Sequence, residues 1–235
     1  MSDHWHLRNV DWLQTLPKAT AAALRRAATE KTYALGETIF GPTRHPEEVC
    51  LLEEGLVRIF RRSPRGGELT IGYVRPGEVF GEVSVIGDRP RVSFAKATKP
   101  SKVLRIPRET FFEVTRSSNA FLFQITKTMG QRLVRCQARA ADLVFLTVPS
   151  RLARMLLRLA TEFGRKTRQG HIVGLPFTQH ELATLIGATR QTVSEVLREM
   201  ITRGLLRRVG HDLVLNDLDA LRELGGLPPS ETVGD

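Results

Sequence analysis

The sequence predicts an α+β protein with an N-terminal antiparallel β-domain, one long helix and a C-terminal winged helix-turn-helix domain. Three observations predict this order. β-branched and aromatic runs alternate with glycine turns from Lys31 to about Pro107, apolar residues then recur every seven positions, and two short helices joined by a glycine occupy Thr178–Met200. At 235 residues, the chain suits one large domain or two modest ones.

The β-domain is predicted from six short runs that are rich in strand-forming residues. These runs are Thr38–Phe40, Val49–Leu52, Leu56–Phe60, Leu69–Val74, Val92–Ala97 and Lys102–Ile106. Many short strands with regular glycine punctuation predict an antiparallel sandwich or barrel. Arg65–Gly66–Gly67 is the expected tip of a hairpin. Residues 9–30, interrupted by Pro17, are expected to be helical.

A long helix is predicted from Asn119 to Leu146. The helix carries an apolar seam in which a residue recurs at every seventh position. These residues are Leu122, Met129, Cys136 and Leu143. This spacing favours a parallel two-stranded dimer, although a helix that packs on its own domain gives a similar pattern. An expected hinge over residues 142–150 contains Pro149.

The C-terminal part begins with a helix that is predicted over Arg151–Phe163. A basic loop is expected at residues 164–170. Leu205–Leu215 is predicted to form a two-stranded wing that turns at Gly210–His211. Residues 221–235 are expected to be disordered.

Local signals between these elements predict a helix-turn-helix. Thr178 and Glu181 have the spacing of a capping box, in which each side chain satisfies a backbone N–H at a helix start. Gly187 follows the first helix where a left-handed residue is needed, and Thr189 can cap the second.

The second helix of this pair has two distinct faces. Its inward residues are predicted to be Val193, Val196, Leu197 and Met200. The opposite face carries Arg190, Gln191, Ser194, Glu195 and Arg198. A core hairpin is the alternative, but it would not usually leave five polar residues on one face. The pattern is typical of a recognition helix that lies in the major groove of DNA.

The charge distribution supports this interpretation. Residues 130–210 contain 14 Arg or Lys against 5 Asp or Glu, and the whole chain has a formal net charge of +10. A basic block around the predicted helix pair is the electrostatic feature expected of a surface that contacts phosphates.

Several other classes of protein are disfavoured. No apolar run approaches a membrane span, and the first ten residues lack the apolar core of a signal peptide. Cys50 and Cys136 are too far apart to suggest a metal cluster, and both are expected to be buried thiols in a reducing cytoplasm. The sequence has no Walker loop, dinucleotide-binding fingerprint or serine-hydrolase elbow. These absences predict a cytoplasmic protein that is not an enzyme and that has no metal site or membrane partner.

The order of β-domain, long helix and winged helix-turn-helix resembles the cAMP receptor protein and fumarate-nitrate regulator superfamily over roughly residues 10–220. The resemblance implies a jelly-roll-like β-roll of the cyclic-nucleotide-binding type. It implies a sensor domain at residues 10–118, a dimerisation helix and hinge at 119–147, a DNA-binding domain at 148–220 and a tail at 221–235. With only two cysteines, the iron–sulfur cluster of some members is not expected.

The segment Gly77–Glu82, followed by Arg91, resembles the family's phosphate-binding cassette. The resemblance implies that Glu82 accepts from a ribose hydroxyl and that Arg91 holds a cyclic phosphate. The effector-binding residues implied in this way are Gly81, Glu82, Arg91, Val92, Ser93, Cys136 and Gln137. Val92 stands where the family has a hydroxyl, and Cys136 and Gln137 stand where cAMP binders have Thr and Ser. A structural Glu82–Arg91 ion pair is the alternative.

The recognition helix also departs from the family in part. Arg190 matches the arginine that binds guanine O6 and N7, whereas Gln191 replaces a glutamate and Glu195 replaces a second arginine. The predicted DNA-binding residues are Arg190, Gln191, Ser194, Glu195, Arg198 and Thr178. Residues for which phosphate contacts are expected include Thr178, Arg198, Arg203, Arg207 and Arg208.

The sequence therefore predicts a homodimeric transcription regulator that binds a palindromic site in double-stranded DNA. No cofactor is expected to be required. The identity of the effector stays open. It could be cAMP, another cyclic nucleotide or a different ligand, or the protein could act without one. Residues 164–170 stand where members of this family contact RNA polymerase, so the resemblance implies RNA polymerase as a partner. The alternative function is a cyclic-nucleotide sensor whose C-terminal domain binds a protein.

Overall fold

A computed structural model describes residues 16–163, 165–167, 170–173, 178–210 and 212–228. The chain divides into two compact units, which separate between Val134 and Arg135, and each is described by itself. The first unit, called the β-unit here, contains the described residues up to Val134. The second, called the C-terminal unit, contains those from Arg135 onward.

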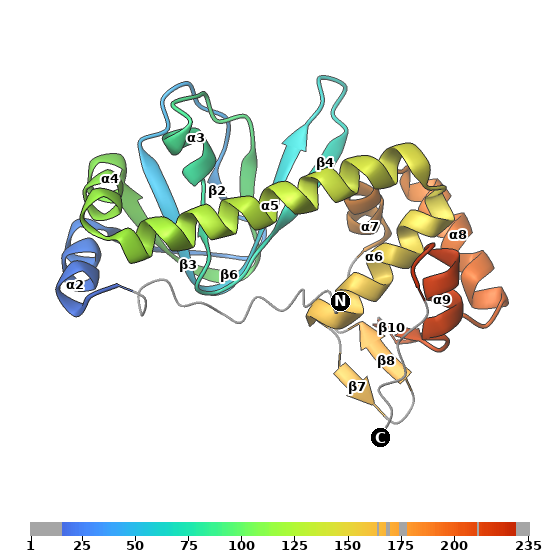
Figure 1. The fold of residues 1–235 in the computed structure, drawn as a ribbon. Helices are drawn as coiled ribbons and strands as arrows, with labels where there is room; N and C mark the ends of the chain where they lie inside the picture. The colour runs from blue at the N-terminus through green and yellow to red at the C-terminus, as the bar shows by residue number, and fades with distance from the viewer. Residues whose placement is uncertain (1–15, 164, 168–169, 174–177, 211, 229–235) are drawn as a thin grey trace. The chain divides into compact units, whose positions relative to one another are not determined.

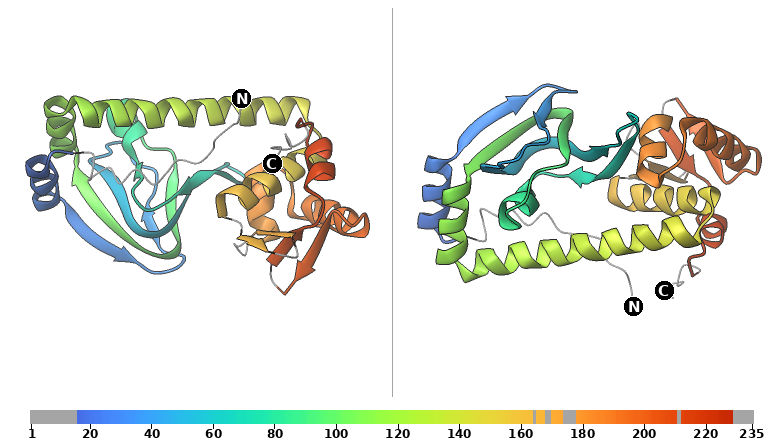
Figure 2. Two further views of the ribbon diagram at one scale, coloured as in Figure 1. Left: turned by 60° about the horizontal axis from the view of Figure 1, so that its bottom comes forward. Right: turned by 90° about the horizontal axis from the view of Figure 1, so that it is seen from above.

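The β-unit is a six-stranded antiparallel sheet that is accompanied by helices (Figure 1). Its elements are α2 (Lys18–Ala27), β1 (Thr29–Tyr33), β2 (Thr38–Phe40), β3 (Glu48–Arg62), β4 (Glu68–Val74), β5 (Val79–Phe80), α3 (Glu82–Ile86), β6 (Phe94–Pro107), α4 (Arg108–Ser117) and the first part of α5 (Asn119–Phe145). The main strand order is β1-β6-β3-β4, with β2 on β6 and β5 on β3. In both views of Figure 2, α2 and α4 lie side by side at one end of this unit.

Two long strands replace four of the short runs that the sequence predicted. β3 joins the predicted runs at Val49–Leu52 and Leu56–Phe60. β6 joins those at Val92–Ala97 and Lys102–Ile106. The pairing of β3 with β6 shifts register three times between Leu52 and Val57, so the ladder is irregular where the sequence shows a break. Gly55 lies in this irregular part with φ 97°.

Three elements of the β-unit differ from the sequence-based expectation. Thr29–Tyr33 is the strand β1, paired with β6, although helix was predicted up to residue 30. The helices α3 and α4 were not predicted. Both are short, and α4 is held by the burial of Phe111 and Val114, a tertiary effect that local pattern does not report.

The central strand β3 is buried on both faces. Val49 and Leu51 belong to a core shared with α4 and α5, whereas Cys50 and Leu52 belong to a second core with Phe80. Alternate side chains of a strand point to opposite faces, so an uninterrupted apolar run fits this position. α5 contributes Phe121 and Ile125 to the first core, with further members including Leu24, Val85, Leu104 and Phe111.

The C-terminal unit combines several helices with a small antiparallel sheet. After the end of α5 its elements are α6 (Val148–Phe163), β7 (Arg165–Thr167), β8 (Gly170–Val173), α7 (Gln179–Ile186), α8 (Arg190–Thr202), β9 (Leu206–Val209), β10 (Asp212–Leu215) and α9 (Leu218–Leu224). The strand order is β7-β8-β10-β9. The predicted two-stranded wing is therefore half of a four-stranded antiparallel sheet.

Three predictions about this unit need correction. The expected basic loop at residues 164–170 contains the strand β7 and the first residue of β8. The tail expected to be disordered begins inside α9, which is capped by the Asp217 carboxylate accepting from the backbone N–H of Ala220. The hinge is shorter than expected, since α6 begins at Val148 and Pro149 occupies its first turn, where a missing N–H costs nothing. The remaining tail residues, from 229, lie outside the described residues.

Gly55→Ala is expected to destabilise the β-unit far more than Gly66→Ala. Both glycines have positive φ, which costs an L-residue about 1–2 kcal/mol. A Cβ at Gly55 would also lie 2.7 Å from Ser101 Cα and closer still to the Ser101 hydroxyl, whereas a Cβ at Gly66 would meet nothing within 4 Å. We expect a loss of about 3 kcal/mol or more for Gly55→Ala in urea unfolding. Equal losses for the two variants would contradict this packing.

Candidate nucleic-acid interface and effector pocket

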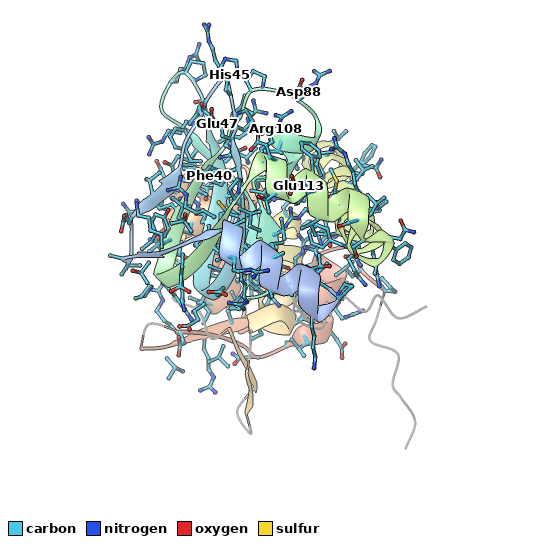
Figure 3. The ribbon with its side chains drawn as sticks, turned by 90° about the vertical axis from the view of Figure 1, so that its left-hand side faces the viewer. Phe40, His45, Glu47, Asp88, Arg108 and Glu113 are labelled. Atoms are coloured by element: carbon cyan, nitrogen blue, oxygen red, sulfur yellow. The ribbon has the colours of Figure 1, made fainter. Side chains whose placement is uncertain are left out.

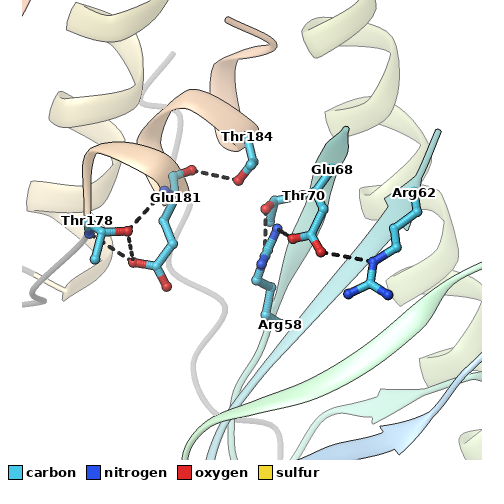
Figure 4. Close-up of polar contacts among 7 residues, drawn as sticks. All are labelled: Arg58, Arg62, Glu68, Thr70, Thr178, Glu181 and Thr184. Carbon is cyan, nitrogen blue, oxygen red and sulfur yellow. Dashed lines mark hydrogen bonds and ion pairs between the residues drawn. The ribbon is translucent and has the colours of Figure 1, made fainter. Parts of the chain in front are cut away.

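The first helix of the predicted helix-turn-helix begins with a complete capping box, as expected (Figure 4). The Thr178 hydroxyl accepts from the backbone N–H of Glu181 at 3.1 Å. The Glu181 carboxylate accepts in turn from the Thr178 backbone N–H at 2.8 Å and from its hydroxyl at 2.9 Å. The Thr178 hydroxyl, for which a phosphate contact was predicted, is thus engaged in starting α7.

A left-handed glycine ends α7 and turns the chain toward α8. Gly187 has φ 66°, and its backbone N–H donates to the Ala183 carbonyl. A Cβ at this position would lie 3.0 Å from Leu143 Cδ2 at the end of α5, so a side chain would fit only if Leu143 shifted, in addition to the strain of the positive φ. Thr189 then caps α8 by accepting from the backbone N–H of Thr192 at 3.1 Å.

Two arginines that were not predicted as site residues hold the C-terminal end of α7. Arg139 of α5 donates to the Leu185 carbonyl at 2.6 Å. Arg151 of α6 donates to the Ile186 carbonyl at 3.0 Å and to the Leu146 carbonyl at 2.8 Å. Guanidinium groups at a helix C-terminus satisfy free carbonyls and complement the helix dipole. The end of α5 and the start of α6 thereby fix the turn before α8.

α8 has the two faces that the sequence predicted. Its apolar residues Val193, Val196, Leu197 and Met200 are buried. Arg190, Gln191, Glu195 and Arg198 are exposed, while Ser194 is half-buried. The Gln191 side-chain nitrogen Nε2 donates to Glu195 Oε1 at 3.1 Å. The result is a capped helix that presents polar side chains from its first turn onward.

The arginines expected at phosphates lie around this helix. Arg203 follows α8 and lies 3.6 Å from the Glu199 carboxylate. Arg207 on β9 donates to the Asn216 side-chain oxygen at 3.1 Å, and Arg208 is exposed beside it. These guanidinium groups belong to the same compact unit as α8.

In the β-unit, the cassette residues Glu82 and Arg91 are both buried, at 3% and 7% exposure. They do not form the ion pair that was considered as an alternative. Glu82 Oε1 instead accepts from Arg132 of α5, which also donates to the Val79 carbonyl at 2.6 Å. Arg91 donates to the backbone carbonyls of Glu48 at 2.8 Å and Gly81 at 3.2 Å.

The surroundings of Arg91 bring its guanidinium close to the cassette backbone. Its guanidinium carbon lies 4.0 Å from the centre of the Phe40 ring. Gly81 has φ 81°, and a Cβ there would lie 3.1 Å from Arg91 Nη2, so glycine permits this approach. The loop before Arg91 is tied to α4 by Arg108, whose Nη2 lies 2.9 Å from Asp88 Oδ1; Figure 3 labels both residues.

Two buried polar atoms of the cassette lack a hydrogen-bond partner among the described residues. They are Glu82 Oε2 and Arg91 Nε. Burial also lowers the pKa of Arg91 by disfavouring its charged form. Such groups are costly unless a ligand or water completes their bonds. One donor and one acceptor suit a ligand that carries both an anionic group and a hydroxyl group.

The other predicted effector residues differ in burial. Val92 is exposed and Ser93 is half-buried. Cys136 and Gln137 are exposed on the part of α5 that belongs to the C-terminal unit. Arg132, which contacts Glu82, was overlooked. The signal that could have revealed Arg132 is its place one helical turn before Cys136.

The two cysteines have different environments. Cys50 is buried as predicted, and desolvation raises the pKa of its thiol to about 12, so it stays protonated. Cys136 was also expected to be buried but is exposed. Among the described residues, no group of three or more His, Cys, Asp or Glu side chains is arranged to hold a metal ion. No described helix is both long enough and apolar enough to cross a membrane.

Comparison with protein families matches both units. Residues 30–118 match the cyclic nucleotide-binding domain, and residues 150–224 match the Crp-like helix-turn-helix domain. The transcriptional regulator LdrP of Thermus thermophilus is 30% identical over 197 residues, which cover 83% of this chain and 96% of LdrP. The chain belongs to the CRP/FNR superfamily. It is a DNA-binding transcription regulator and not an enzyme.

Other members of the superfamily are similar over most of their length. A CRP-like cAMP-activated global transcriptional regulator of Mycobacterium tuberculosis is 29% identical over 208 residues, covering 88% of this chain and 93% of that protein. The solved structure of a CooA mutant from Carboxydothermus hydrogenoformans has a TM-score of 0.75 at 26% identity, covering 86% of this chain and 90% of that one. The CRP/FNR fold predicted from the sequence is thus confirmed.

Proposed function

We propose that this CRP/FNR regulator acts in the cytoplasm as a homodimer and binds a palindromic duplex by placing α8 in the major groove. The observation that carries this proposal is the exposed row of Arg190, Gln191, Glu195 and Arg198 on a helix whose other face is fully buried. The net positive charge of residues 130–210 favours DNA over a protein partner for the same surface.

The proposal of a dimer rests on the apolar side chains that α5 leaves exposed. They are Leu122, Phe123, Leu133, Val134, Leu143, Val144 and Phe145. Leu122 and Leu143 belong to the seven-residue seam, and Leu133 is 59% exposed. A second α5 packed along this seam would bury Leu122, Leu133 and Leu143 and relate two recognition helices by two-fold symmetry.

For the β-unit we propose a cyclic nucleotide as effector. The unsatisfied atoms of Glu82 and Arg91 supply an acceptor for a sugar hydroxyl and a donor for a phosphate oxygen. The match to the cyclic nucleotide-binding domain and the cAMP-activated relative support this choice. We further propose RNA polymerase as a partner through the basic segment at residues 164–170.

Arg190→Ala is expected to weaken binding most strongly to duplexes that retain the half-site guanine. A guanidinium that bonds O6 and N7 contributes about 1–3 kcal/mol of discrimination. Fluorescence anisotropy with a selected genomic fragment and a guanine-substituted version measures the difference. Arg26→Ala, which removes an exposed charge on α2, serves as the control. The same loss on every duplex would show that Arg190 contacts phosphate only.

Arg91→Leu is expected to abolish binding of cAMP in calorimetry, and Arg91→Lys to weaken it by about tenfold or more, because lysine keeps the charge but loses the planar fork. Circular dichroism checks that both variants fold. Arg89→Leu, at an exposed position two residues away, is the matched control and should bind as the wild type does. Unchanged affinity in the two Arg91 variants would refute the pocket assignment, and a parallel titration with cyclic-di-GMP tests a larger nucleotide.

A further inference from the structure

Glu195 and Gln191 form a side-chain pair on the exposed face of α8. Gln191 Nε2 donates to Glu195 Oε1 at 3.1 Å, one helical turn apart, and both side chains are exposed. We infer that Glu195 is a positioning residue that fixes the Gln191 amide, so that Gln191 selects adenine at one base pair of each half-site. This inference rests on the proposed role of α8 in the major groove.

The chemistry of the two groups makes the pairing directional. A glutamine amide has an acceptor oxygen at one end and a nitrogen with two N–H donors at the other, whereas a carboxylate only accepts. Glu195 can therefore bond the nitrogen of Gln191 but not its oxygen. If the amide turned over, two acceptors would face each other, so Glu195 determines which end of the amide lies toward it.

The amide that is fixed in this way still has a donor and an acceptor available. Nε2 has a second N–H, and Oε1 is not used by Glu195. Adenine presents an acceptor at N7 and a donor at N6 in the major groove, which matches this pair of groups. Guanine presents two acceptors, N7 and O6, so Gln191 Oε1 would face an acceptor. The Glu195 contact thus favours adenine over guanine.

The Glu195 carboxylate has two separable effects on DNA binding, one from its charge and one from its hydrogen bond to Gln191. A carboxylate on a face that approaches DNA repels the phosphates of every sequence equally. Its hydrogen bond to Gln191 acts only at the base pair that Gln191 contacts. Removing the charge should therefore raise affinity generally, while removing the bond should reduce discrimination at one position.

The test begins with selection of duplexes from a random pool by the wild type and by Gln191→Ala, which identifies the base pair read by residue 191. Affinities are then measured for four duplexes that differ at that base pair, with Glu195→Gln and Glu199→Gln as the compared variants. Glu199 is an exposed glutamate of the same helix that lies 3.6 Å from Arg203, so its replacement removes the same charge without touching Gln191. Circular dichroism checks that all variants fold.

We expect the wild type to prefer adenine over guanine by about tenfold. Glu195→Gln should reduce that ratio by about threefold or more, because an amide at residue 195 can bond either end of Gln191. Glu199→Gln should leave the ratio within about twofold, while both variants raise affinity for all four duplexes to a similar degree.

Three results would overturn the inference. They are a wild-type preference for another base at this position, an effect of Glu195→Gln at a different base pair, and an effect that equals that of Glu199→Gln on every duplex. The second result would mean that Glu195 reads a base itself. A wild type that selects no sequence from the pool would instead refute the proposed function of α8.

Discussion

A glycine in the left-handed conformation sets the direction in which α8 leaves α7. Gly187 can adopt φ 66° without strain, and it packs closely against Leu143, which would have to shift to admit a Cβ. Arg139 and Arg151 hold the carbonyls immediately before it. The polar face of α8 is exposed because its apolar face is buried in this arrangement. A change at the turn would therefore move every candidate base contact together.

The β-unit contains two buried arginines with different roles. Arg58 donates to Thr70 at 2.8 Å and to Glu68 at 2.9 Å (Figure 4). Its guanidinium carbon lies 4.5 Å from the centre of the Phe60 ring. Burial would raise the pKa of Glu68, but hydrogen bonds from Arg62 and Arg58 outweigh it and hold that pKa below its usual value. Arg58 thus joins β3 to β4. Arg91, by contrast, has a buried Nε without a hydrogen-bond partner among the residues that the structure describes, which fits the effector-binding role proposed for it.

The parts of the fold that depend on local chemistry could be predicted from the sequence. The Thr178–Glu181 capping box and the Gly187 turn involve residues within a few positions of one another, so their spacing defines them. β1 and α4 were missed because distant strands and buried aromatic residues stabilise them. The Arg132–Glu82 contact joins residues 50 positions apart, and Cys136 is exposed although a thiol is usually buried. Local sequence pattern does not determine either result.

In the proposed complex, α8 of each protomer reads a guanine in the major groove of one half-site. Methylation interference with dimethyl sulfate tests it most directly, since this reagent modifies guanine N7 in the major groove and adenine N3 in the minor groove. Methylation of one guanine in each half-site, about 10 base pairs apart, should prevent binding of the wild-type protein. Interference at adenine N3 alone, or at no position, would contradict the claim.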